Sequence, residues 1–400
     1  MNHSVLPQER EASVQVVKIA EKVKEVKFRK PLLSRIINNK ASQETDLLES
    51  LPNFQGSPAL TAQEWQSYFD ESGKLTVDPQ LIKKKIFLGG LDPSIRAEAW
   101  KYLLDYYPWN STKAERMSII EEKKKIYEQV KNQWKSITPE ELANFTMWFS
   151  RKDQIERDVV RTDRNLEPFK EYEPYLSKIS NILITYSWHF WNIGYTQGMN
   201  DLVAPLIILM EDESDTYWCF VGLMNKHSEN FVKTQIGIYK RLFSFSKMIK
   251  LMDPSLHSYL EKIESSHLLF CFRWLLLSFK RELEPEELYR LWDTFWSWHV
   301  PDFQMFFGFA VLLQKREEIL NNKLDPDHLF KISSEISISL EPTLSMAYTL
   351  HSKFEERASQ EDKNLIFNQD MDDCLVVQQH SIHKDISTKD TIYPKKFFLI

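Results

Sequence analysis

The sequence predicts an all-α protein. Glycine is scarce, with 9 residues among 400, whereas its usual share is about 7%. Hairpin turns and bulges draw on glycine, so this scarcity weighs against an all-β fold. Trp and Phe are plentiful, at 12 and 25 residues, and they supply the large apolar side chains that helix packing uses. From Thr61 onward, apolar residues recur at helical spacing over most of the chain.

The helices can be justified in order from local signals. Thr61 and Glu64 have the spacing of a capping box and predict a helix start. A glycine pair at 89–90 ends the next segment, and Asp92 and Pro93 then supply a cap and a first-turn proline. Helical spacing or a start signal predicts the further segments Ser118–Trp134, one opening at Pro139, Tyr175–Trp191, Met199–Met210, Asp215–Leu223, Lys233–Asp253, Ser255–Glu264, Leu268–Lys280, Pro285–Trp298 and Phe303–Asn321.

The composition along the chain predicts three parts. Residues 1–57 are expected to be an accessory segment and linker, residues 58–350 a helical domain, and residues 351–400 a polar, disordered tail. Lysines dominate the stretch Val14–Lys30. That stretch could be a solvated or marginal helix, or it could touch an anionic membrane surface.

Bulk properties exclude several classes of protein. The formal net charge of -6 argues against general nucleic-acid binding, which needs a clustered basic surface. The N-terminus lacks the apolar region of a signal peptide, and no apolar run approaches the ~20 residues that span a bilayer. Cys219, Cys271 and Cys374 lie far apart, which indicates buried, reduced thiols in a cytosolic protein.

One candidate for chemistry is an arginine at the end of a helix-like segment. Arg161 follows Val160, and Asp158 lies one turn back as an acceptor that could orient the guanidinium. Such an arginine could project from the surface and offset the negative charge that develops on phosphoryl oxygens in another protein's nucleotide site. The same two residues could equally form an ordinary salt bridge at the surface or between helices.

A second candidate is a glutamine in a predicted loop. Gln197 lies between Thr196 and Gly198, where a carboxamide could both donate a hydrogen bond and accept one from an attacking water. It could also be an ordinary hydrogen-bonding loop residue. Asn200 or Asp201 is expected to cap the helix that follows.

Other polar groups predict less. The acidic residues around Pro285 suit a helix start rather than a metal site, and the pair His380 and His383 lacks a supporting ligand framework. No metal site is therefore expected, and neither a P-loop nor a nucleophile elbow occurs. The acidic residues are Glu282, Glu284, Glu286 and Glu287.

Five ordered motifs resemble those of the TBC family, whose members are GTPase-activating proteins for Rab GTPases. Ile155–Arg161 is similar to the family's IxxDxxR signature, and Tyr195–Asp201 to its YxQGMxD stretch. The others are Gly90–Arg96 followed by Trp100, with one residue more than the family's G-x-P-x-x-R element, then Phe272–Trp274 followed by Phe279–Glu282 as the FRW…RE block, and Leu291–Asp293 as the LWD element.

The resemblance implies a V-shaped, all-helical domain that supplies two catalytic side chains in trans. Arg161 would stabilise the transition state and Gln197 would orient the attacking water. The chain would have no turnover and no cofactor of its own, because GTP and Mg²⁺ belong to the partner. Positioning roles would fall to Asp158, Tyr195, Gly198 and Asp201, and framework roles to Arg96, Trp100, Arg273, Trp292 and Asp293.

The resemblance also implies a partner and a location. The partner would be a GTP-bound Rab, and Glu64–Gly73 resembles a branch of the family that acts on late-endosomal Rabs. The protein would then be cytoplasmic, lie peripherally on endomembranes and regulate vesicle trafficking. The alternative is a silent TBC-like module that binds a Rab or an adaptor as a scaffold.

Overall fold

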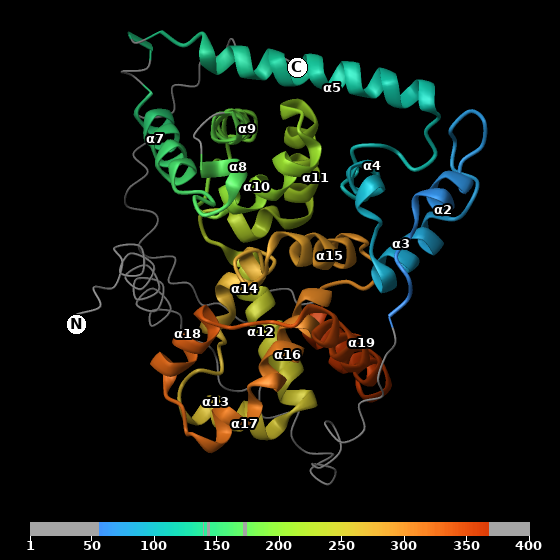
Figure 1. Cartoon of the computed structure of the whole chain (residues 1–400). Coiled ribbons are helices and arrows are strands. Elements are labelled where there is room, and N and C mark those ends of the chain that lie inside the picture. The colour runs from blue at the N-terminus through green and yellow to red at the C-terminus, as the bar shows by residue number, and fades with distance from the viewer. Residues whose placement is uncertain (1–55, 139, 142–144, 171–173, 368–400) are drawn as a thin grey trace. The chain divides into compact units, whose positions relative to one another are not determined.

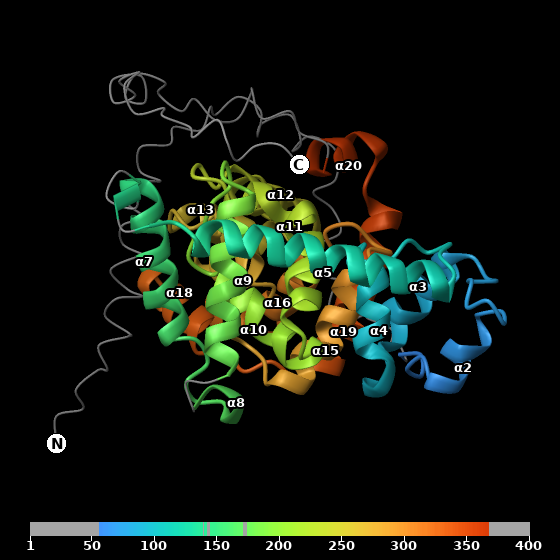
Figure 2. The ribbon, with the colours of Figure 1, turned by 90° about the horizontal axis from the view of Figure 1, so that it is seen from above.

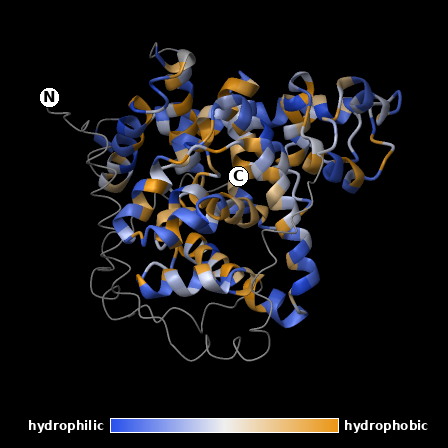
Figure 3. Ribbon diagram, turned by 60° about the horizontal axis from the view of Figure 1, so that its bottom comes forward, coloured by the Kyte–Doolittle hydropathy of each residue, from blue (hydrophilic) through white to orange (hydrophobic). Residues whose placement is uncertain are grey.

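A computed structural model describes residues 56–138, 140–141, 145–170 and 174–367. Within these ranges the regular elements are helices, accompanied by two isolated bridges, Leu60 with Leu91 and Phe69 with Leu75. The predicted all-α class is confirmed. All helices from α2 to α19 belong to one unit, Leu47–Gln360, and most of them carry both hydrophilic and hydrophobic residues (Figure 3).

The first and third helices begin where the sequence predicts polar caps, and the second begins after Asp78, a cap that was not predicted. Thr61 accepts a hydrogen bond from the N–H of Glu64, and Asp92 from that of Ser94. The predicted break at the glycine pair is confirmed, because Gly90 ends the second helix with a φ of 74°. The three helices are α2 (Ala62–Ser67), α3 (Pro79–Gly89) and α4 (Pro93–Leu103).

The long helix α5 (Lys113–Lys135) starts five residues before the predicted Ser118. Thr112 and Glu115 form a reciprocal capping box there, which the sequence analysis overlooked. Helix α5 packs on α9 (Tyr175–His189) and α11 (Glu213–Phe231), as both ribbon views show (Figures 1 and 2).

Helices α7 (Thr146–Val160), α9 and α10 (Met199–Met210) pack on one another. The two candidate stretches are Ile155–Arg161, which ends at the exit of α7, and Tyr195–Asp201, which spans the loop before α10 and its first turn. The short helix α8 (Glu167–Lys170) lies between α7 and α9 in the chain. The bounds predicted for α10 are confirmed, and those predicted for α9 end two residues too late. The predicted helix at Pro139 falls mostly outside the described residues.

Later in the chain, two predicted helices are interrupted. Ser278 and Phe279 have φ values of 50° and 61°, which end helix α14 before Lys280. The segment predicted as Phe303–Asn321 breaks at Lys315. The elements here are α12 (Ile236–Met252), α13 (Pro254–Lys262), η3 (Leu269–Cys271), α14 (Phe272–Leu276), α15 (Pro285–Trp296), α16 (Phe303–Gln314) and α17 (Arg316–Asn321).

The helical part extends further than predicted. Helices α18 (Pro326–Ser334) and α19 (Leu340–Arg357) were not expected, and the predicted boundary at residue 351 falls inside α19. Helix α19 buries Leu350 and packs against α16. The packing of this apolar face stabilises the helix although its composition is polar. A further helix, α20 (Gln360–Phe367), lies where the tail was expected to be disordered. The expectations for residues 1–55 and 368–400 lie outside the described residues, and so do those for Cys374, His380 and His383.

A fully buried carboxylate joins the N-terminal helices to α15. Asp293 accepts hydrogen bonds from Arg96 Nε and Nη2 at 3.2 Å, from Trp100 Nε1 at 2.7 Å and from the N–H of Leu91 at 3.0 Å. Trp100 and Trp292 are also fully buried, with ring centroids 6.2 Å apart. These contacts set how α4 crosses α15.

Elsewhere in the core, Cys219 and Cys271 are buried free thiols, as predicted. Burial raises the pKa of Cys219 to about 12, so its thiol stays protonated.

Among the described residues, no helix combines the length and the apolarity that crossing a membrane requires.

We expect Arg96→Met to lower the free energy of unfolding by about 3–5 kcal/mol, because it leaves the Asp293 carboxylate buried without its cation. Urea unfolding of the two proteins measures the difference. The double variant Arg96→Met/Asp293→Leu removes both charges and should recover a large part of the loss. A loss below about 1 kcal/mol in the single variant would contradict this account of the pair.

The same carboxyl predicts a pH dependence. Burial raises the pKa of Asp293 to about 6 from 3.8, so the folded state binds this proton more tightly than the unfolded state does. The resulting stabilisation is fully present below the unfolded-state pKa and is lost as the pH rises through 6. Measured relative to Asp293→Asn by urea unfolding, the stability of the wild type should fall by about 2 kcal/mol between pH 4 and 7. If the difference in free energy of unfolding between the two proteins did not change with pH, this expectation would be wrong.

Candidate functional site

Arg161 lies at the exit of α7, as the sequence predicts. Its backbone N–H donates to the carbonyl of Asp158 at 3.1 Å, which tightens the last turn. Its side chain is 46% exposed, and Nη2 donates to Asp158 Oδ1 at 2.8 Å. The guanidinium therefore faces solvent in part while one buried acceptor holds it.

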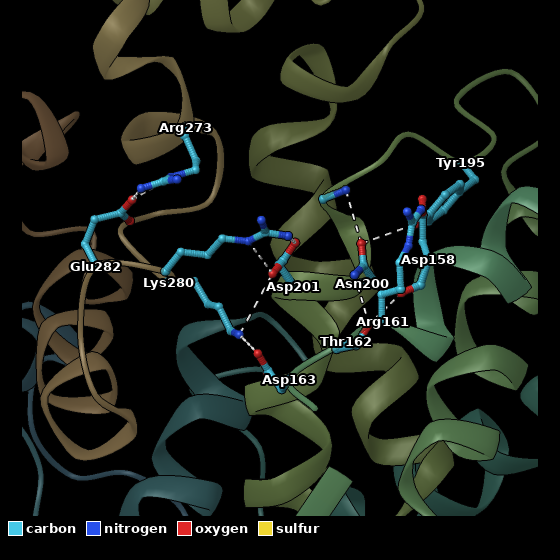
Figure 4. A network of polar contacts seen from close by, with 12 residues as sticks. Asp158, Arg161, Thr162, Asp163, Tyr195, Asn200, Asp201, Arg273, Lys280 and Glu282 are labelled. Atoms are coloured by element: carbon cyan, nitrogen blue, oxygen red, sulfur yellow. Dashed lines mark hydrogen bonds and ion pairs between the residues drawn. The ribbon is translucent and has the colours of Figure 1, made fainter. Parts of the chain in front are cut away.

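Asp158 connects the arginine to the second candidate stretch (Figure 4). Its side chain is only 6% exposed, and its Oδ2 accepts a hydrogen bond from the Tyr195 hydroxyl at 2.9 Å. Burial, and then the negative charge of Asp158, raise the pKa of Tyr195 well above its usual value, so the hydroxyl remains a donor. One carboxylate thus binds the end of α7 with one oxygen and the loop before α10 with the other.

The loop that carries Gln197 is anchored on both sides. Tyr195 is buried, and Thr196 Oγ1 donates to the carbonyl of Phe231 at 2.6 Å. On the other side, the N–H of Gly198 donates to Asn200 Oδ1 at 3.2 Å. Gln197 is half-buried between these anchors, so its backbone position is fixed by its neighbours.

Helix α10 begins without a side-chain cap, so the expectation that Asn200 or Asp201 caps it is wrong. Both residues lie inside the first turn and are committed to other partners. Asn200 Nδ2 donates to Thr162 Oγ1 at 2.9 Å, and that hydroxyl donates to the carbonyl of Asp158 at 3.1 Å. Asn200 and Thr162 therefore form a second link between the two stretches, one that the sequence analysis missed.

A second charge cluster adjoins the first (Figure 4). Asp201 accepts from Arg281 Nε at 3.0 Å and Nη2 at 2.9 Å. Lys280 donates to the carboxylate of Asp163, two residues beyond Arg161. Lys280 and Arg281 lie within the segment that resembles the RE block, but the motif alone assigned neither of them a role.

Glu282 does not belong to an acidic helix start, and that expectation is wrong. It is buried, and its Oε1 accepts from Arg273 Nε at 2.8 Å and lies 2.7 Å from Nη2 in an ion pair. Burial raises its pKa even though Arg273 opposes the shift. Glu284, Glu286 and Glu287 do lie at the start of α15, where carboxylates suit the helix dipole.

The residues singled out from the sequence fall into three places. Asp158, Arg161, Tyr195 and Gly198 lie at the junction of α7 with the loop before α10, and Asp201 lies in the adjoining charge cluster. Arg273 pairs with Glu282. Arg96 and Trp100 bind the buried Asp293 carboxylate described above, and Trp292 packs against Trp100. Across the part of the chain that the structure describes, no three His, Cys, Asp or Glu side chains gather as metal ligands.

The fold and this site define an all-helical domain that presents an arginine at a helix exit beside a glutamine on an anchored loop. A model of the Rab-GTPase-TBC domain matches residues 93–320. The chain therefore belongs to the Rab-GTPase-TBC domain family.

Similar proteins include two from distant organisms. The chain is 35% identical over 304 residues to TBC1 domain family member 17 of Homo sapiens, covering 75% of this chain and 47% of that protein. It is 33% identical over 341 residues to the GTPase-activating protein GYP7 of Saccharomyces cerevisiae, covering 74% and 46%. The chain thus spans about half the length of these relatives.

Solved structures share the fold. The Ypt/Rab-GAP domain of Gyp1p superposes with a TM-score of 0.64 at 21% identity, covering 73% of this chain and 98% of that one. A flagellar RabGAP TBC domain from Chlamydomonas gives a TM-score of 0.54 at 18% identity, covering 72% and 89%. The all-α TBC fold predicted from the motifs is confirmed.

A side chain at Gly198 should destabilise the fold because of the backbone conformation there rather than because of the neighbouring atoms. Its φ is 103°, and a Cβ there would lie 2.8 Å from Leu277 Cδ2, the movable end of a side chain. We expect Gly198→Ala to cost about 1–2 kcal/mol of stability through the backbone. In urea unfolding, Leu277→Ala should not rescue that loss. A rescue of more than about 1 kcal/mol would instead show that the steric contact dominates.

Proposed function

We propose that this chain accelerates GTP hydrolysis by a GTP-bound Rab-family GTPase, with Arg161 and Gln197 entering the partner's nucleotide site. The observation that carries the proposal is the Asp158 carboxylate, which holds the Arg161 guanidinium and the Tyr195 hydroxyl at the same time. It fixes a cationic side chain next to the loop that bears Gln197. Relatives that are named as GTPase-activating proteins support the same activity.

Arg161 has the placement that a transition-state stabiliser needs. Its guanidinium is 46% exposed at the end of a rigid helix, within reach of a docked protein. In the partner's site it would offset the charge that develops on the transferred phosphoryl oxygens. Asp158 would limit the rotamers that the arginine samples before the partner binds, which lowers the entropic cost of the encounter.

Gln197 is proposed to orient the attacking water. Its carboxamide can accept a hydrogen bond from the water and donate another to the partner. Tyr195 and Gly198 would hold the backbone on either side of it, and Asp201 would hold the first turn of α10 through Arg281. The buried set around Asp293 would serve as framework, while GTP and Mg²⁺ belong to the partner.

The partner is proposed to be a late-endosomal Rab, as the resemblance of Glu64–Gly73 implies. The chain would then act in vesicle trafficking, peripherally on endomembranes and through that partner. Because a short motif does not record the surface contacts that set specificity, a panel of GTP-loaded Rabs is the proper test.

We expect Arg161→Ala to slow GTP hydrolysis by a cognate Rab by about 10²–10⁵-fold, because the transition-state charge loses its cation. Gln197→Ala should also lower the rate, and both variants should stay folded. The measurement is single-turnover phosphate release across the Rab panel. Arg157→Ala is the matched control, since Arg157 is 66% exposed on the same helix and pairs with Asp153; its rate should stay within about threefold of the wild type.

Two outcomes would overturn the mechanism. Unchanged turnover in Arg161→Ala on a Rab that the wild type accelerates would remove the arginine from the chemistry. A wild type that binds several GTP-loaded Rabs but accelerates none would instead favour the silent scaffold module.

A further inference from the structure

The turn between α14 and α15 is strained. Ser278 and Phe279 are consecutive non-glycine residues with φ values of 50° and 61°. Each such residue costs on the order of 1–3 kcal/mol and persists only where the surroundings determine its conformation. Such strain tends to accumulate at functional sites, so the side chains that this turn presents are of interest.

The turn is fixed from several directions. Phe279 is fully buried, with its ring centroid 4.8 Å from that of Phe307 and 5.7 Å from that of Trp274. The carbonyl of Ser278 accepts from Trp292 Nε1 at 2.9 Å, and its hydroxyl accepts from Gln304 Nε2 at 3.0 Å. The residues that follow are therefore presented on a rigid base.

The first of these residues is Lys280, whose side chain is only 8% exposed. Its ammonium donates to the carboxylate of Asp163 and lies 3.9 Å from Asp201 Oδ1. Arg281 pairs with Asp201 through two hydrogen bonds, so the ammonium of Lys280 mainly balances the charge of Asp163.

Asp163 in turn lies where the chain leaves α7. It is two residues past Arg161, and its φ of 46° places it in the left-handed region, within the turn that follows α7. Asp201 is four residues past Gln197, in the first turn of α10. Lys280 thus contacts Asp163, just past the first candidate stretch, and lies near Asp201 at the end of the second (Figure 4). Contacts of Asp158 and Asp163 therefore hold the chain three residues before Arg161 and two residues after it.

We propose that Lys280 is a positioning residue that sets the direction in which Arg161 leaves α7 and its distance from the Gln197 loop. This inference rests on the proposed function for its effect on rate. Without the ammonium, the Asp163 carboxylate, whose side chain is 13% exposed, would turn toward water and no longer hold the turn that follows α7. Arg161 would keep its contact with Asp158, but the direction in which its backbone leaves α7 would no longer be fixed.

The loss should appear in the chemical step rather than in binding. A misplacement of about 1 Å can cost roughly 10² in rate, whereas Lys280 is too buried to contribute much contact area to a partner. We therefore expect Lys280→Met to lower the maximal single-turnover rate about 10–100-fold, with the half-saturating concentration changed less than about threefold.

A matched control separates the effect of the position of Lys280 from the effect of losing a buried ion pair anywhere in the domain. Lys131 is 13% exposed and pairs with Glu213 across α5 and α11, away from both stretches. Lys131→Met should lower stability to a similar degree and leave the maximal rate unchanged.

A double variant separates positioning from a merely structural role. Lys280→Met/Asp163→Asn removes both buried charges, so urea unfolding should show most of the stability restored. The maximal rate should nevertheless stay low, because the link to the turn is still absent. Recovery of the rate together with the stability would overturn the positioning role, and so would a wild-type rate in Lys280→Met.

Hydrogen exchange tests the inference without a partner. The amides of residues 161–166 and 196–199 should exchange faster in Lys280→Met than in the wild type, while Lys131→Met should leave them unchanged. If the wild type accelerated no Rab, the proposed function would fail and this comparison alone would decide the structural part. Equal exchange in all three proteins would overturn the inference.

Discussion

Three of the buried aspartates determine which segments around the candidate site and the N-terminal helices lie side by side. Asp158, Asp201 and Asp293 are 6%, 3% and 0% exposed. An ionised carboxylate is costly to bury unless a cation and hydrogen-bond donors satisfy it, and removing one partner of such a pair costs about 3–5 kcal/mol. Each of the three finds donors on a different segment of the chain: Tyr195 for Asp158, Arg281 for Asp201, and Arg96 with Trp100 for Asp293.

Apolar packing alone would leave these segments less precisely placed. Helix surfaces interdigitate in a few preferred classes of crossing angle with considerable scatter, and a core of Leu, Ile and Phe tolerates small shifts. A carboxylate that must meet a guanidinium or a hydroxyl at about 2.9 Å tolerates much less. Asp158 and Asp201 lie three residues before Arg161 and four after Gln197, so the tightest constraints act where the chemistry is proposed to occur.

The sequence predicted most helices and the exit of α7 because their signals are local. Asp92 with Pro93 marks a helix start, and Arg161 one turn after Asp158 marks an exit, within a few residues of chain. It predicted neither the αL turn at Ser278 nor the pairing of Lys280 with Asp163, because both depend on residues far away in the chain. Asn200 was mistaken for a cap for the same reason: its partner, Thr162, lies on another segment.

Burial divides the site into two kinds of residue. The side chains that hold position, Asp158 and Lys280, are 6% and 8% exposed, while Arg161 is 46% exposed. A group that acts inside another protein must reach the surface, yet a flexible surface arginine would lose rotamer entropy on every encounter. Placing the constraints beneath the arginine meets both demands, since the guanidinium stays accessible while the backbone that carries it is already ordered. The reacting groups themselves would come with the partner, so the described surface needs no enclosed pocket to be competent.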